Sequence, residues 1–133
     1  MLWTKSLETG VAKIDEQHKE LFRQVDILVD RSQADRIEKT LEFLKSYVAK
    51  HFADEEYLQK INNYPKAEAH KKLHVDFTKT FKELYDKYKT AGDRKLTVVL
   101  SINSAVIGWL KDHIMVHDKE FATYYLAKNQ ARK

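Results

Sequence analysis

The stretch AEAHKKLHVDFTKTFKELYDKY, residues 67–88, decides the fold class, because apolar and imidazole side chains recur in it at alternating steps of three and four. Such spacing keeps returning to one face of an α-helix. The stripe consists of Ala67, His70, His74, Phe77, Phe81, Leu84 and Tyr88. Lysines and acidic residues fill most of the other positions. The stretch therefore predicts an amphipathic helix with two histidines on its buried stripe.

Three further segments carry a similar stripe, and turn residues separate the four. We expect helices over about residues 12–31, 35–62, 65–91 and 94–116, and a short helical piece through Tyr124, Tyr125 and Leu126. The polar segment from Ser32 to Asp35 turns the chain after the first helix. Connections this short join antiparallel neighbours. The sequence thus predicts an all-α, up-down-up-down four-helix bundle with a short C-terminal helical extension.

Proline and glycine mark the other helix boundaries. The residues from Asn62 to Pro65 interrupt the second helix, and Pro65 suits the first turn of the third, where a missing N–H costs little. Gly92 is well placed to end the third helix. Asp93 is expected to cap the fourth helix at its N-terminus.

Metal-binding side chains lie on all four apolar stripes. They are His18 on the first, His51 and Glu55 on the second, His70 and His74 on the third, and His113 on the fourth. In an antiparallel bundle these positions fall at heights within roughly 12 Å of one another near one end. Leaving them buried without partners would cost several kcal/mol. A metal centre would satisfy them all.

Length and composition limit the alternatives. A chain of 133 residues with 43% apolar and 33% charged residues fits one globular domain, which we expect to span residues 1–133. Cysteine is absent. Thiolate zinc sites, iron–sulfur clusters and covalently attached c-type haem are therefore excluded, and any metal must be bound by nitrogen and oxygen.

Neither a membrane nor a nucleic acid is expected as a partner. No apolar run is long enough to span a bilayer, and the segment from Met1 to Ser6 lacks the blocks of a signal peptide. We therefore expect a cytoplasmic protein. The net charge of +4 comes from 24 basic and 20 acidic residues, which are interleaved along the chain. A nucleic-acid surface would instead gather its basic residues on one face.

Imidazole and carboxylate ligands together suit iron, manganese, zinc or copper. Six such groups, and a seventh near the end of the fourth helix, are too many for one tetrahedral zinc, but they fit two ions bridged by carboxylates. Two residues compete for the seventh position. His117 follows His113 by four residues and stays on its face in a regular helix, whereas Asp118 is rotated about 140° away. Helix geometry alone favours His117.

The full ordered set resembles the hemerythrins, most closely the single-domain bacteriohemerythrins. The segment Gly10-Val-Ala-Lys-Ile-Asp-Glu-Gln-His18 is similar to the family's first-helix signature. His51-Phe-Ala-Asp-Glu55 is similar to the second, and Trp109-Leu-Lys-Asp-His113-Ile with Asp118-Lys to the last. The resemblance covers nearly the whole chain. The ordered set is far more specific than any of its pieces.

The resemblance implies two iron ions per chain, cycling between Fe2+ and Fe3+, with an oxo or hydroxo bridge. The implied ligands are His70, His74 and His113 on one iron, His18 and His51 on the other, and Glu55 and Asp118 bridging both. The second iron then keeps one open position, where O2 would bind. The family pattern thus favours Asp118 and requires the last helix to loosen or end near Val116. His117 becomes a surface or supporting residue.

We expect reversible binding of O2 for its carriage, storage or delivery, by a monomer that is not an enzyme. The alternatives are a di-iron enzyme acting on peroxide, nitric oxide or ferrous iron, and an oxygen or iron sensor. The side chains expected around the open position are apolar and donate no proton, which favours a carrier; they are Leu21, Phe52, Trp109, Leu110 and Ile114. The chain ends soon after its bundle, without a signalling domain, which disfavours a sensor.

Overall fold

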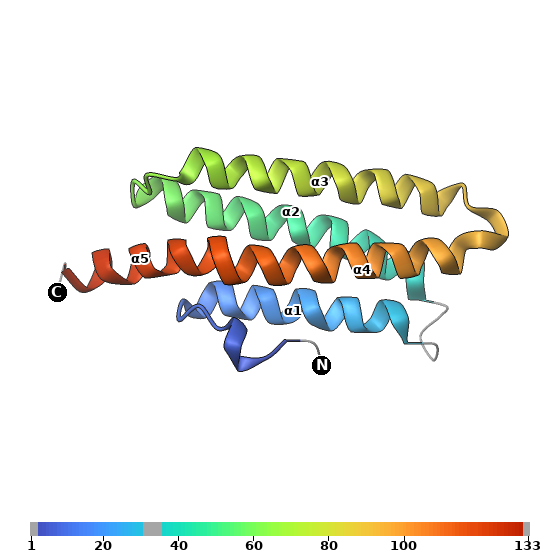
Figure 1. The fold of residues 1–133 in the computed structure, drawn as a ribbon, viewed down its shortest axis with the longest axis horizontal. Helices are drawn as coiled ribbons and strands as arrows, with labels where there is room; N and C mark the ends of the chain where they lie inside the picture. The colour runs from blue at the N-terminus through green and yellow to red at the C-terminus, as the bar shows by residue number, and fades with distance from the viewer. Residues whose placement is uncertain (1–2, 31–35, 132–133) are drawn as a thin grey trace.

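The computed structural model describes residues 3–30 and 36–131 (Figure 1). Its α-helices are α1 (Ala12–Val29), α2 (Ile37–Ile61), α3 (Ala67–Lys89), α4 (Lys95–His113) and α5 (Lys119–Ala131). The 3-10 turns η1 (Lys5–Leu7) and η3 (Gly92–Arg94) precede α1 and α4, and a π-helical turn, η4 (Ile114–Asp118), joins α4 to α5. These two ranges contain no strand, and none of their helices is long and apolar enough to cross a bilayer.

Helices α1 to α4 form an antiparallel bundle in which each packs against the next and α1 also packs against α4. This confirms the predicted four-helix fold. Figure 1 shows α4, η4 and α5 as one continuous rod that runs beyond the bundle. The C-terminal extension is therefore longer than the short piece that the sequence predicts. The reason is η4, which widens the helix without breaking it, so that the chain stays helical past Val116.

The helix ends differ from the prediction in several places. Asn63 has φ 54°, and the N–H of Tyr64 donates to the carbonyl of Gln59 at 3.0 Å, a capping pattern that ends α2. Pro65 lies in the turn that follows, so α3 starts at Ala67 rather than with the proline. Gly92 has φ 60°, but α3 ends earlier than predicted, at Lys89 with Thr90 as its cap, and Gly92 instead begins the 3-10 turn η3.

Asp93 does not cap α4, contrary to the prediction. It lies inside η3, and Arg94 takes the cap position without a side-chain hydrogen bond. The one-residue offset arises because the chain makes a 3-10 turn before the α-helix begins. The first helix ends at Val29, two residues before the predicted Arg31, because Asp30 is extended. The expected polar turn from Ser32 to Asp35 lies outside the described residues.

The start of α1 is held in place by Asp15. Its carboxylate accepts hydrogen bonds from the backbone N–H groups of Thr9 (2.8 Å) and Gly10 (3.1 Å). Gly10 has φ 91°, and a Cβ atom there would lie 3.2 Å from the side chain of Leu126 in α5. Glycine therefore lets this loop pass close to α5 and fixes where α1, the helix of His18, begins.

Two apolar clusters fill the interior. The long core occupies most of the bundle and includes Leu21, Leu41, Leu44, Phe77, Phe81 and Ile102; the end core, beside α5, contains Val11, Ile14, Tyr64, Phe121 and Ala122. Trp3 packs on the long core, and Tyr124 and Tyr125 pack on the end core. Along α1, His18 lies between Ile14 and Leu21, so the polar cluster sits between the two cores.

Candidate metal centre

The structure brings all seven predicted ligands together. His18 comes from α1, His51 and Glu55 from α2, His70 and His74 from α3, His113 from the last residue of α4, and Asp118 from η4. Each is at most 4% exposed. Five histidines and two carboxylates thus share one buried space. The helical stripes predicted this for six of them, whereas the resemblance alone favoured Asp118.

These side chains form two groups, and in each group one ligand atom from every residue lies within 4.8 Å of the others. One group contains Glu55, His70, His74, His113 and Asp118; the other contains His18, His51, Glu55 and Asp118. The two carboxylates belong to both groups. The geometry therefore offers two adjacent cation positions joined by shared carboxylates.

The imidazole nitrogens of the first group converge. His113 Nε2 lies 2.8 Å from His70 Nε2 and 3.1 Å from His74 Nε2. Adjacent corners of an octahedron with metal–nitrogen bonds of about 2.1 Å lie about 3.0 Å apart. His113 Nε2 therefore lies at the spacing of a neighbouring octahedral ligand from each of the other two nitrogens.

Several buried polar atoms of the cluster have no hydrogen-bond partner within the described part of the chain. They are both carboxylate oxygens of Glu55 and of Asp118, and both ring nitrogens of His18. His18 Nε2 is only 2.9 Å from Asp118 Oδ2, yet the direction of approach gives no hydrogen bond. Each unpaired buried group costs about 1–3 kcal/mol, and more where it is charged. Bound cations would remove this cost, and the all-nitrogen and oxygen ligand set fits a di-iron site.

Burial and neighbouring charges set the protonation of the histidines. Burial, reinforced by His18, lowers the pKa of His51 to about 4, so this imidazole stays neutral as a metal ligand must be. Burial also lowers the pKa of His70, but the carboxylates of Asp118 and Glu55 outweigh it and raise this pKa to about 9. His70 Nε2 lies 2.7 Å from a Glu55 oxygen and 3.1 Å from an Asp118 oxygen, so the two carboxylates favour positive charge at this position.

Both carboxylates are kept ionised. Burial alone would raise the pKa of Asp118, but the imidazoles of His113, His18 and His70 hold it well below its usual range. Burial and the charge of Asp118 would raise the pKa of Glu55, and the imidazoles of His70 and His74 lower it below its ordinary value. Two buried negative charges are thus available to bind cations.

The π-helical turn explains how Asp118 reaches the cluster. In η4 the N–H of Lys119 donates to the carbonyl of Ile114, five residues earlier, so five residues make about one turn. Asp118 Oδ1 consequently lies 3.1 Å from His113 Nε2. His117 is turned aside, half-buried, with its ring 5.4 Å from that of His113. The preference of helix geometry for His117 fails because the helix is not regular there.

A second layer of side chains, which the sequence analysis missed, orients the histidines. His51 Nδ1 lies 2.6 Å from Gln17 Oε1, an atom that can only accept, so Nδ1 carries the proton and Nε2 remains free for the cluster. Gln17 in turn donates to Asp54 at 2.8 Å. His70 Nδ1 lies 3.0 Å from the amide of Gln59. Such outer partners fix the ring orientation and tautomer of metal-binding histidines.

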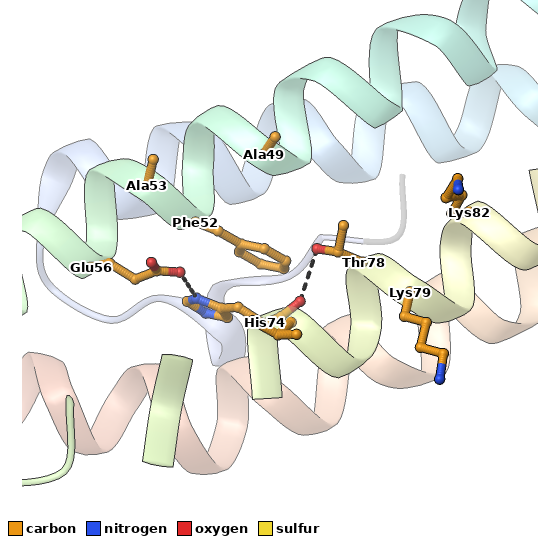
Figure 2. Close-up of a pocket in the computed structure, with 9 residues that line it drawn as sticks. Ala49, Phe52, Ala53, Glu56, His74, Thr78, Lys79 and Lys82 are labelled. Atoms are coloured by element: carbon orange, nitrogen blue, oxygen red, sulfur yellow. Dashed lines mark hydrogen bonds and ion pairs between the residues drawn. The ribbon is translucent and has the colours of Figure 1, made fainter. Parts of the chain in front are cut away.

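Glu56 does the same for His74. Figure 2 shows its carboxylate bonded to His74 Nδ1, at 2.9 Å. The two residues line a surface groove of about 460 Å³ between α2 and α3. In that groove the Phe52 ring stacks on the His74 imidazole with centroids 3.8 Å apart. An aromatic ring therefore packs face to face on this histidine.

The three residues of the acidic run Asp54-Glu55-Glu56 have contacts that the sequence does not predict. Its pattern predicts Glu55 as the single ligand candidate of the run and is otherwise typical of a solvated surface. Instead, Asp54 supports Gln17, and Glu56 supports His74. No sequence pattern singles out either of these acids, since both bonds cross between helices. Gln59, four residues after Glu55 on the same stripe, could have been noticed.

Comparison with known proteins agrees with this geometry. Residues 9–125 match the model of a family described as hemerythrin HHE cation binding domain. The bacteriohemerythrin of Clostridium acetobutylicum is 31% identical over 90% of this chain and 97% of its own length. That of Pseudomonas paraeruginosa is 31% identical over 89% of this chain and 76% of its own.

The match to the myohemerythrin of Theromyzon tessulatum is 38% identical but shorter, covering 60% of this chain and 64% of that protein, less than two thirds. The family match runs from before the start of α1 into α5, and it includes every member of the buried cluster. The chain belongs to the hemerythrin family.

Proposed function

We propose that the seven buried side chains hold two iron ions and that the centre binds O2 reversibly, as a carrier, store or delivery protein. The observation that carries the proposal is the pair of ligand groups sharing Glu55 and Asp118. One group adds three imidazoles to the carboxylates, and the other adds two. The group with His18 and His51 thus offers one protein ligand fewer, which leaves room for an external molecule. Two ferrous ions bound there could supply two electrons to O2 and recover them on its release.

The surrounding side chains favour release over reaction. Leu21, Phe52, Leu110 and Ile114 are buried in the long core. Leu21 and Leu110 lie one helical turn from His18 and His113, and Phe52 and Ile114 directly follow His51 and His113. None of them can donate a proton, and together they exclude water from the centre. Trp109 adds a ring stacked on His113 at 4.2 Å.

The two alternatives are a di-iron enzyme and an oxygen or iron sensor. An enzyme acting on peroxide or nitric oxide needs a proton donor beside the open position. His117, the sixth histidine of the chain, has its ring near those of His113 and His70, at 5.4 and 6.1 Å. Both belong to the three-histidine group rather than to the group with His18 and His51. This placement favours the carrier.

Metal analysis with optical spectroscopy tests the proposal. Protein purified in air without added metal should contain close to two irons per chain. It should show charge-transfer absorption bands that disappear under argon and return with air. One zinc and no iron would overturn the metal assignment. Two irons with bands that never reverse, together with turnover of peroxide or nitric oxide, would instead support the enzyme.

A further inference from the structure

The solvent side of α4 differs from that of the other helices. Residues 96–110 contain no Asp, Glu, Lys or Arg, although 33% of the chain is charged. Two large apolar side chains stand out from this side, Leu96 with 58% and Leu100 with 52% of their surface exposed. In the view of Figure 1, α4 passes in front of α2 and no other element lies over it. This apolar side has no partner among the residues that the structure describes.

The exposed residues follow the spacing of a helix–helix seam. Leu96, Leu100 and Ser104 are exposed, and the half-buried Ile107, which also packs on the long core, follows them; the four succeed one another at steps of four, four and three, as in the contact stripe of a coiled coil. Ser104 is small, and beside the stripe Gly108 has no atom within 4 Å of the place where a Cβ would stand. A second helix could therefore approach α4 closely along this stripe, which we call the α4 seam.

The charges at the two ends of the α4 seam identify its partner. Asp93 lies three residues before Leu96, and Lys111 lies four residues after Ile107, so both continue the stripe. Both are exposed, and neither makes an ion pair with another described residue. An antiparallel copy of the seam would set Asp93 against Lys111 and Leu96 against Ile107, twice over by symmetry. A parallel copy would oppose like charges.

We propose that two copies of this protein pair through their α4 seams in an antiparallel, two-fold symmetric dimer. The proposal departs from the monomer expected from the sequence. A single helix seam buries less than the roughly 800 Å² per partner of a standard interface. The dimer therefore forms at high protein concentration and dissociates on dilution. The seam lies outside the metal cluster, so dimerisation does not depend on the proposed oxygen binding.

Sedimentation equilibrium of the full, iron-loaded chain over a wide concentration range tests the dimer. Leu100→Lys should weaken dimerisation at least about tenfold, because it removes an apolar contact beside the two-fold axis and brings the two introduced lysines within about one helical turn of each other. Ile61→Lys is the matched control, since Ile61 is an aliphatic residue of α2 with nearly the same exposure, 51%. Circular dichroism and iron content should be unchanged in both variants. A wild type that stays monomeric at every concentration, or equal weakening by both variants, overturns the proposal.

Charge exchange tests the antiparallel orientation. Asp93→Lys should weaken the dimer by opposing two lysines, and Lys111→Asp should weaken it by opposing two aspartates. The double variant carrying both changes should recover wild-type dimerisation, because each introduced lysine again meets an introduced aspartate of the other copy. Failure of the double variant to recover, when each single variant has weakened the dimer, overturns the antiparallel arrangement.

Discussion

The two halves of the bundle bury their helical stripes in different ways. One half is remote from the metal ligands, and we call it the apolar half. Its stripes consist of apolar side chains that pack on one another, among them Leu28, Leu41, Leu44, Phe81 and Ile102. In the metal half the same stripes carry imidazoles and carboxylates, and several of their polar atoms have no hydrogen-bond partner among the described residues. Among the described residues, the first half holds no cluster of buried charged groups. The second is complete only with bound cations.

This difference shows that the residues that stabilise the bundle and the residues that bind metal lie in different halves of it. Hydrocarbon burial in the apolar half contributes about 25 cal/mol for each Å² removed from water, whatever metal is present. In the metal half, the buried carboxylates of Glu55 and Asp118 oppose folding until positive charge neutralises them. Helices held together at one end can therefore keep the ligand positions close to one another before metal arrives.

Metal removal should have the largest effect. Chelation of a reduced sample should lower the unfolding free energy by about 4 kcal/mol or more, since a ligand present at a thousandfold excess over its Kd contributes that much. The melting temperature should fall by on the order of 15 °C. Hydrogen exchange should accelerate around residues 51–55 and 113–118, and much less around residues 37–44. Equal acceleration in both halves would mean that the halves are not energetically distinct.

Replacement of Asp118 should come next. Asp118→Ala removes a carboxylate that both ligand groups share, so we expect loss of most bound iron and of the stability that depends on it. His117→Ala is the control, because its ring borders the cluster but belongs to neither group. Iron content by elemental analysis and thermal melting are the measurements. Iron loss in His117→Ala with iron retained in Asp118→Ala would exchange the roles of the two residues.

Leu44→Ala should test the apolar half by itself. Leu44 is fully buried in the long core, in a part of α2 remote from Glu55. Truncation should cost about 2–5 kcal/mol through lost burial and the cavity that remains. Denaturant unfolding should detect this loss, whereas iron content and the optical spectrum of the folded protein should be unchanged. Loss of iron at denaturant concentrations where the variant remains folded would show that the halves are coupled.

The same contrast explains what the sequence could predict. The stripes depend on residue spacing within one helix, so the helices and the convergence of His18, His51 and His70 were predictable from local pattern. The π-helical turn was not, because nothing in the spacing of residues 114–118 distinguishes it from a regular α-helix. The family resemblance favoured Asp118 where helix geometry favoured His117, and η4 shows why the two disagreed.

The side chains that hydrogen-bond to the metal-binding histidines could not be predicted from the sequence either. Gln17 meets His51 across the gap between α1 and α2, and Glu56 meets His74 across that between α2 and α3. Whether two side chains of neighbouring helices meet depends on the relative rotation and axial position of the helices. Both must be known to within about one residue. Periodicity gives neither to that precision, since predicted boundaries carry errors of roughly two to four residues.

The smallest expected effect comes from comparing two similar hydrogen bonds, one in each half of the bundle. Glu56 and Glu42 both belong to α2, and both accept a hydrogen bond from α3: Glu56 from His74, and Glu42 from the hydroxyl of Tyr85. Glu56→Ala should weaken metal binding about 10–100-fold, because His74 would lose the partner that fixes its orientation. Glu42→Ala should cost about 1 kcal/mol of stability or less and leave metal affinity unchanged.

Competition with a chelator of known affinity measures both variants, and Glu56→Gln adds a further control. An amide oxygen can still accept from His74 Nδ1 without carrying charge. If orientation is what Glu56 provides, the glutamine variant should recover most of the affinity lost with alanine. If both Glu56 variants bind metal as weakly as each other, the negative charge matters more than the orientation. Equal metal affinity in Glu56→Ala and Glu42→Ala would mean that the metal half does not depend on this outer layer.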